Sequence, residues 1–290
     1  KRKRETREMT DFAIEFKKVV KQYDDFMLHD VSFVLPRGCI MGIIGENGAG
    51  KSTMIKLMLN LIQKEAGKIT VLGCDSDRLS RSVREKIGVV FDECCFPENL
   101  KLKEIEKILK NIYQHWNSKA FKEYAATFNL PENKAVKDFS RGMKMKLSIA
   151  AALSHHAELL ILDEATSGLD PVVRDEILDV FFDFIQEEKN SILISSHITS
   201  DLEKICDYIT FLNNGSIIMS EAKDDILTKY VVVKGGRDEL ESLPKEEIIG
   251  IRKSQFGAEA LIRRQAAPIG FVVEPADLEQ IMLFNIRKEQ

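Results

Sequence analysis

The chain has 290 residues, of which 44% are hydrophobic, and its formal net charge is −4 at pH 7. This length suits one ordinary domain with a smaller appendage, and this hydrophobic content excludes wholesale disorder. Proteins dedicated to nucleic-acid binding are usually basic, so the acidic balance argues against that class.

The five cysteines and the apolar runs indicate the compartment. The cysteine count is odd and no pair is spaced as CxxC, which is typical of a reduced, cytosolic chain. No run reaches the roughly 18 to 20 apolar residues that cross a bilayer, because His155, His156 and Glu158 interrupt the longest one. With no secretory signal either, we expect any membrane pore to belong to another polypeptide.

The amino-terminal region begins with a basic run and continues with strands. Residues 1–10 contain KRKRETR, which we interpret either as a structureless tail or as a contact with anionic lipid. From Phe12 the pattern FAIEF alternates, and VSFVL and CIMGIIG follow. The continuous apolar run IMGII predicts a strand buried on both faces of a mostly parallel sheet, and a helix from Lys51 to Ile62 follows it.

The middle of the chain predicts a helical insert followed by more strands. From about residue 98 to 156 the segment LKEIEKILKNIYQHW is amphipathic, a second helix follows Asn117, and a third begins near Arg141. The strand pattern returns in LLILD, SILISS, YITFL and SIIM, with a helix at about 172–188 between the first two. Alternating strands and helices of this kind indicate an α/β fold.

The organisation changes near Ala222. The segments YVVVK, EEIIGIR, AEALIRR and IGFVVE predict short strands, and Pro275 is expected to start a last helix. That helix carries an apolar stripe made of Leu278, Ile281, Met282 and Ile286. The stripe either docks on its own small sheet or forms a dimer or regulatory contact.

A glycine-rich phosphate loop is the strongest chemical signal. The motif is Gly45-Glu46-Asn47-Gly48-Ala49-Gly50-Lys51-Ser52-Thr53, which matches GxxxxGK[ST] in full between a strand and a helix. Its backbone N–H groups and the amino end of the helix are suited to phosphate oxygens. Lys51 supplies a charge to the β- and γ-phosphates, and Ser52 supplies a hydroxyl to Mg²⁺.

The segment LLILDE at 159–164 is the second signal. An apolar strand delivers Asp163 to its carboxyl end, where sheets of this kind bind ligands. Asp163 is expected to hold Mg²⁺ through water, and Glu164 to polarise the attacking water. Together with the phosphate loop, this pair favours a nucleotide hydrolase over a passive nucleotide sensor.

These motifs and four further segments resemble the ATP-binding subunits of ABC transporters over about residues 11–222. The run from Phe139 to Met143 stands at the LSGGQ signature, and Ser167-Gly168-Leu169-Asp170 resembles the D-loop. His197 resembles the switch histidine, and Tyr23 resembles the aromatic residue that stacks on adenine.

The resemblance implies a fold and a partner. It implies a P-loop NTPase (RecA-like) core with an antiparallel amino-terminal β subdomain, a helical insert at about 93–156 and a small α+β tail at 223–290. In the family two subunits close head to tail around two ATP molecules. Ser140, Gly142 and Asp170 are then expected to act on the nucleotide of the partner, with Lys51, Glu164 and His197 as the catalytic group.

Two departures from the family pattern stand out. Phe139, Arg141 and Met143 replace Leu, Gly and Gln in the signature, while Ser140 and Gly142 are kept. Arg141 either adds positive charge near the nucleotide or faces solvent. Asp92 stands where the family usually has the Gln that senses Mg²⁺, and it is either a metal ligand or a solvated loop acid.

We therefore expect a cytosolic-face ATPase of a membrane exporter that uses ATP and Mg²⁺. The tail resembles ABC-2-type export ATPases, of which the phenol-soluble-modulin and lantibiotic-immunity kinds fit best. A membrane permease is the expected partner, docking between core and insert near residues 92–100, where Phe96, Pro97 and Leu100 offer an apolar floor. The alternative is a soluble ABC ATPase acting on nucleic acid, ribosomes or cofactor assembly.

Overall fold

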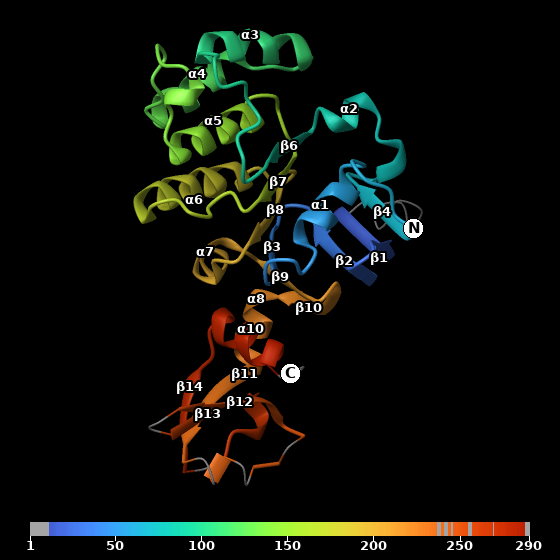
Figure 1. Ribbon diagram of the computed structural model, residues 1–290, viewed down its shortest axis with the longest axis vertical. Helices are drawn as coiled ribbons and strands as arrows, with labels where there is room; N and C mark the ends of the chain where they lie inside the picture. Colours follow the sequence, from blue (N-terminus) through green and yellow to red (C-terminus); the bar gives the residue numbers. More distant parts are fainter. Residues whose placement is uncertain are drawn as a thin grey trace, which may run out of the picture.

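The computed structural model describes residues 12–236, 239–240, 243–244, 246–254, 257–268 and 270–287, so the basic run at 1–10 lies outside the described residues. A six-stranded sheet in the order β10-β9-β3-β8-β7-β6 forms the centre of the part of the chain that ends at Ala222 (Figure 1). All neighbouring strands run parallel except β10, which pairs antiparallel with β9. The strands are β3 (Ile40–Ile44), β6 (Ile87–Val90), β7 (Leu159–Asp163), β8 (Ser191–Ser196), β9 (Tyr208–Asn213) and β10 (Ser216–Ala222).

A second, antiparallel sheet has the order β2-β1-β4-β5 and lies beside the central sheet. Its strands are β1 (Phe12–Gln22), β2 (Met27–Pro36), β4 (Ala66–Val71) and β5 (Cys74–Asp75). Helix α1 (Lys51–Met58) packs between the two sheets, because its buried Met54 and Ile55 share one apolar cluster with Phe16 and Ile43. The helix ends earlier than the predicted Ile62, since Asn60 adopts a positive φ of 54°.

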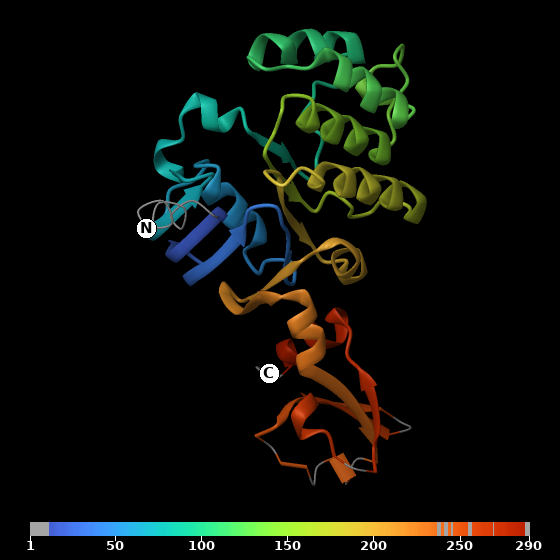
Figure 2. The same cartoon turned by 180° about the vertical axis from the view of Figure 1, so that it is seen from behind.

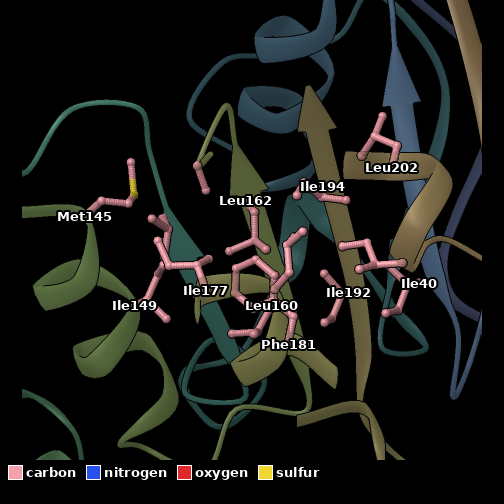
Figure 3. Packing of buried hydrophobic residues seen from close by; sticks show 14 of the residues in the cluster. Ile40, Met145, Ile149, Leu160, Leu162, Ile177, Phe181, Ile192, Ile194 and Leu202 are labelled. Carbon is pink, nitrogen blue, oxygen red and sulfur yellow. The ribbon is translucent and has the colours of Figure 1, made fainter. Parts of the chain in front are cut away.

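The other face of the central sheet is covered by α5 (Arg141–Leu153), α6 (Pro171–Ile185) and α7 (Thr199–Ile205). Figure 3 shows Ile177 and Phe181 of α6 against Leu160 and Ile192 of the strands. Strands β3, β7 and β8 are buried at every residue, as the continuous apolar runs predict. The fold is therefore α/β with a P-loop NTPase core, as expected.

The helical insert consists of α3 (Leu102–Ile112), α4 (Ser118–Thr127) and α5, and the short α2 (Arg81–Arg84) precedes β6. The prediction of one helix through Trp116 is wrong, because α3 ends at Ile112 and Tyr113 takes an extended conformation. The Tyr113 ring stacks on His155 at 4.1 Å, and the Trp116 ring packs against Phe121 at 5.3 Å. Contacts with α4 and with the turn after α5 thus accompany the end of α3 before its amphipathic pattern ends.

A third sheet follows the linking helix α8 (Lys223–Lys229) and lies at the far end of the molecule from the helical insert (Figure 2). Its antiparallel order is β12-β13-β11-β14, from β11 (Tyr230–Gly235), β12 (Ile248–Ser254), β13 (Gly257–Arg263) and β14 (Val272–Pro275). The last helix, α10 (Leu278–Arg287), packs on this sheet and on α7.

The predicted start of the last helix at Pro275 is wrong. Pro275 is the last residue of β14, and α10 begins at Leu278. The carboxylate of Asp277 accepts from the Gln280 N–H at 2.7 Å, while the Gln280 side chain accepts from the Asp277 N–H at 3.1 Å. This reciprocal pair caps the helix in the manner of a capping box. The apolar stripe of α10 is buried in the core cluster that includes Val232 and Leu261 of its own sheet, which confirms the first interpretation of the stripe.

Candidate nucleotide site

The phosphate loop joins β3 to α1 and owes its shape to glycines. Gly48 and Gly50 have φ values of 86° and 113°, which residues with a side chain rarely adopt. Gly50 is also the residue that caps α1 without using a side chain. The first N–H groups of α1 therefore stay available to an anion at the positive end of the helix.

Three predicted catalytic side chains meet at the carboxyl ends of β3, β7 and β8. The Glu164 carboxylate lies 3.3 Å from Lys51 Nζ through Oε1 and 2.7 Å from His197 Nδ1 through Oε2. Lys51 is buried and also donates to the Gly45 carbonyl at 2.7 Å. The structure thus joins residues that are 113 and 33 positions apart from Glu164 along the chain, since 164 − 51 = 113 and 197 − 164 = 33.

The backbone at Glu164 has an unusual conformation. Its φ is 52°, in the left-handed region that non-glycine residues seldom occupy. The Glu164 N–H donates to the Ser195 carbonyl at 3.1 Å and to Ser195 Oγ at 3.2 Å, which holds this conformation in place. Strained backbone of this kind is typical of residues whose side chain must be aimed at a ligand.

The oxygen donors near the loop suit a magnesium ion that is bound largely through substrate. Ser195 Oγ donates to the buried Asp163 carboxylate at 2.6 Å, and Ser52 and Asp92 line the pocket itself. In the part of the chain that the structure describes, no three His, Cys, Asp or Glu side chains gather as a metal cage. Magnesium prefers few protein oxygens together with water and phosphates, so this donor set fits it.

A pocket of about 580 Å³ contains most of the predicted nucleotide-binding residues. They are Tyr23, Asn47, Gly48, Gly50, Lys51, Ser52, Thr53, Asp92 and Glu164. Of the other loop residues, Gly45 accepts from Lys51 and Ala49 is buried behind the loop.

Asp25 and Phe26 also line this pocket, and the sequence did not predict either of them, while Glu46 lines it as a member of the predicted loop. A Cβ on Gly50 would lie 2.7 Å from the tip of the Phe26 ring, so this ring packs on the loop. The Phe26 carbonyl accepts from the Tyr23 N–H at 2.7 Å, which sets both aromatic residues in one turn. The sequence signal that identifies Phe26 is an aromatic residue three positions after Tyr23.

The signature residues lie apart from this pocket. Ser140 Oγ accepts from the Met143 N–H at 3.2 Å and caps α5, and Asp170 accepts from the Val173 N–H at 3.0 Å and caps α6. Neither residue, nor Gly142, lines the pocket with Lys51. Within one chain, the structure therefore does not bring these three predicted residues to the nucleotide.

A cleft of about 150 Å³ separates the core from the helical insert and receives the Phe96 side chain. Phe96 is half-buried and packs against the main core cluster, and Cys95 and Glu93 are exposed at the same cleft. Its inner wall includes His155, whose Nδ1 lies 2.8 Å from the Glu85 carbonyl and whose pKa is lowered by burial. Pro97 and Leu100, the other two predicted floor residues, do not line the cleft.

Comparisons with known proteins agree with this geometry. The family described as "ABC transporter" matches residues 28–167. "Lantibiotic transport ATP-binding protein SrtF" of Streptococcus pyogenes is 36% identical over 68% of this chain and 85% of its own length. "Nod factor export ATP-binding protein I" of Rhizobium leguminosarum bv. viciae is 34% identical over 71% of this chain and 68% of its own length. A solved structure titled "Structure of ATP binding subunit of ABC transporter" is 28% identical, with a TM-score of 0.67, over 74% of this chain and 91% of that chain.

Proposed function

Because the chain belongs to the ABC transporter family as an ATP-binding, ATP-hydrolysing subunit, we propose that it is the Mg-ATP-driven motor of a membrane exporter. We assign the ATPase domain to residues 11–222, with the helical insert at about 93–156. Residues 223–290 form a smaller carboxyl-terminal domain.

The observation that carries the proposal is the contact of Glu164 with both Lys51 and His197 beside the phosphate loop. Lys51 leaves the Gly45 carbonyl for the β- and γ-phosphates when ATP binds, which frees the Glu164 carboxylate to orient and polarise water. His197 holds the other oxygen of Glu164 and reaches the γ-phosphate. Ser52, Asp163 and Asp92 would hold magnesium, which would supply positive charge to the phosphates.

A second subunit supplies the remaining contacts. Ser140 and Gly142 lie away from their own chain's pocket, at the amino end of α5. In a head-to-tail dimer, the Ser140 hydroxyl and the Gly142 N–H donate to the γ-phosphate bound by the partner, and Asp170 lies at the same interface. The partner is a second copy of this chain or a related subunit.

A membrane permease is the partner that moves cargo. In the part of the chain that the structure describes, no helix is long and apolar enough to cross a membrane. The names of the relatives, lantibiotic transport and Nod factor export, support the export of a peptide, antibiotic or lipid-linked cargo. We place the protein on the cytoplasmic face of the membrane, bound to this permease through the cleft at Phe96, with no role for nucleic acid.

Phosphate release by the purified full chain tests the cofactor assignment. We expect release from ATP in the presence of Mg²⁺ and loss of release when the metal is chelated. Restoring excess Mg²⁺ should recover the rate. Hydrolysis that persists without a divalent ion would contradict the role given to magnesium.

Copurification from detergent-solubilised membranes tests the permease. Phe96→Glu and Cys95→Glu each place a charge in the cleft, and both should release a membrane partner that the native chain retains, while ATP affinity stays unchanged. Leu61→Glu is the matched control, because Leu61 is 61% exposed outside the cleft. A partner retained by both cleft variants would place the docking site elsewhere. If the native chain finds no membrane partner, the soluble ATPase is the better reading.

A further inference from the structure

Arg141 is the first residue of α5, between Ser140 and Gly142, and it lies against another loop of the same chain. A Cβ built on Gly168 would be 2.8 Å from Nη1 and 3.0 Å from Cζ of Arg141. The flat guanidinium group therefore fills the space above Gly168, in the loop at 167–170 that follows β7. Arg141 is exposed, as one of the two interpretations left open by the sequence expects, and its guanidinium also packs on Gly168.

No carboxylate accounts for this position of Arg141. Asp92 and Glu93 line the same pocket of about 500 Å³, yet within the described ranges neither forms an ion pair or hydrogen bond with Arg141. The neighbouring cations on α5 differ, because Lys144 pairs with Glu98 at 3.2 Å and Lys146 pairs with Glu176. A cation at the amino end of a helix is also electrostatically unfavourable, because that end carries a partial positive charge. Packing on Gly168 is therefore the interaction that accounts for the position of the guanidinium.

The loop is shaped to accept this group. Gly168 has a φ of 67°, a conformation that favours glycine, and any side chain there would meet the guanidinium. One residue further along α5, a Cβ on Gly142 would lie 3.4 Å from Val173 and 4.0 Å from Leu169. The amino end of α5 thus contacts the 167–170 loop through Arg141 on Gly168, and at Gly142 its backbone passes close to Leu169 and to Val173 of α6.

We propose that Arg141 is a positioning residue that fixes the 167–170 loop to the amino end of α5. The two segments then meet the nucleotide of the partner subunit as one rigid surface. This inference rests on the proposed function, because that proposal assigns both segments to the partner's ATP. Arg141 acts through Ser140 and Gly168, so its substitution changes turnover and ATP-driven dimerisation without changing ATP affinity of the single chain.

A double-mutant cycle of the full chain tests the contact. Arg141→Ala should lower kcat about tenfold with an unchanged KM and unchanged thermal stability, while Lys144→Ala, which removes a paired cation from the same helix, should stay near the native rate. Gly168→Ala should lower kcat further, mainly through the backbone strain at a φ of 67° and in addition by displacing the guanidinium. In the double variant the clash is gone, so the combined loss should be at least about threefold smaller than the product of the single losses.

Arg141→Lys separates packing from charge, because lysine keeps the charge and lacks the planar group. Turnover close to that of Arg141→Ala is expected. A native rate for Arg141→Ala, full rescue by lysine, or strictly multiplicative losses in the cycle would each overturn the inference. Glu164→Gln is measured in the same assay: if it hydrolyses ATP normally the proposed function fails, whereas a dead Glu164→Gln beside a normal Arg141→Ala rejects only the role of Arg141.

Discussion

We propose that two regions of the molecule contact the phosphates of ATP, and the two regions are built differently. At the carboxyl ends of β3, β7 and β8, Lys51, Glu164 and His197 contact one another within one chain. At the amino end of α5, Ser140 only caps its own helix and Arg141 packs on Gly168. In the first region the polar side chains pair with one another around the nucleotide pocket. In the second region the polar groups lie outside that pocket.

This difference separates what one chain does alone from what needs a partner. On our proposal, the phosphate loop with Glu164 is sufficient to bind a nucleotide and to hold a water-activating carboxylate beside it. The signature region has donors at a helix end but no phosphate loop of its own chain next to it. Substitutions in the first region should therefore affect chemistry, and those in the second should affect only the assembled dimer.

Glu164→Gln should have the largest effect, because it removes the carboxylate while keeping the shape of the side chain. We expect turnover to fall by roughly 10²- to 10⁴-fold, as is typical when a general base is lost. ATP affinity should stay near native, since the loop and Lys51 remain. Phosphate release measures the turnover, and a nucleotide-binding titration measures the ATP affinity. Near-native hydrolysis by the variant would assign Glu164 another role.

Ser140→Ala tests the second region, at the amino end of α5. Loss of one hydrogen bond of about 1.4 kcal/mol to a charged phosphate should lower turnover roughly tenfold, with ATP affinity of the single chain unchanged. The helix cap is also lost, which costs about 1 kcal/mol of stability. Asn117→Ala is the matched control, because Asn117 caps α4 in the same way outside the signature. If both variants lose turnover equally, the role of Ser140 is only structural.

Asp92→Ala should have the smallest effect of the three. Asp92 is exposed and lines the pocket, so its carboxylate is a candidate water-mediated ligand of magnesium. We expect a shift of a few fold, roughly, in the Mg²⁺ concentration required for half-maximal turnover, and weaker stimulation by the permease. For the Mg²⁺ titration the control is Glu93→Ala, an exposed neighbour outside the nucleotide pocket. Identical Mg²⁺ titrations for native chain and variant would make Asp92 a solvated loop acid.

Local motifs account for most of what the sequence predicts correctly. The loop at 45–53 and the strand before Asp163 are contiguous in sequence, and their apolar runs and glycines reflect backbone geometry directly. The convergence of Lys51 with His197 on Glu164 depends on the order of strands in the sheet, which periodicity alone does not give. Only the resemblance to a family anticipated it.

Tertiary contacts explain the failures. The pattern around Tyr113 is amphipathic, yet stacking on His155 and burial of Trp116 end α3 at Ile112. Phe26 was missed because it looks like an ordinary turn residue until α1 brings Gly50 against its ring. In both cases the deciding neighbour is distant in sequence, so no local rule identifies it.

The mass of the Glu164→Gln chain in solution, measured by light scattering with and without Mg-ATP, tests the central claim most directly. The two regions complete one site only when two subunits meet, and without hydrolysis ATP stays at their interface. We therefore predict a monomer without nucleotide and a stable dimer with Mg-ATP, and the dimer should be weakened by adding Ser140→Ala. A chain that binds ATP tightly and remains a monomer would contradict the account.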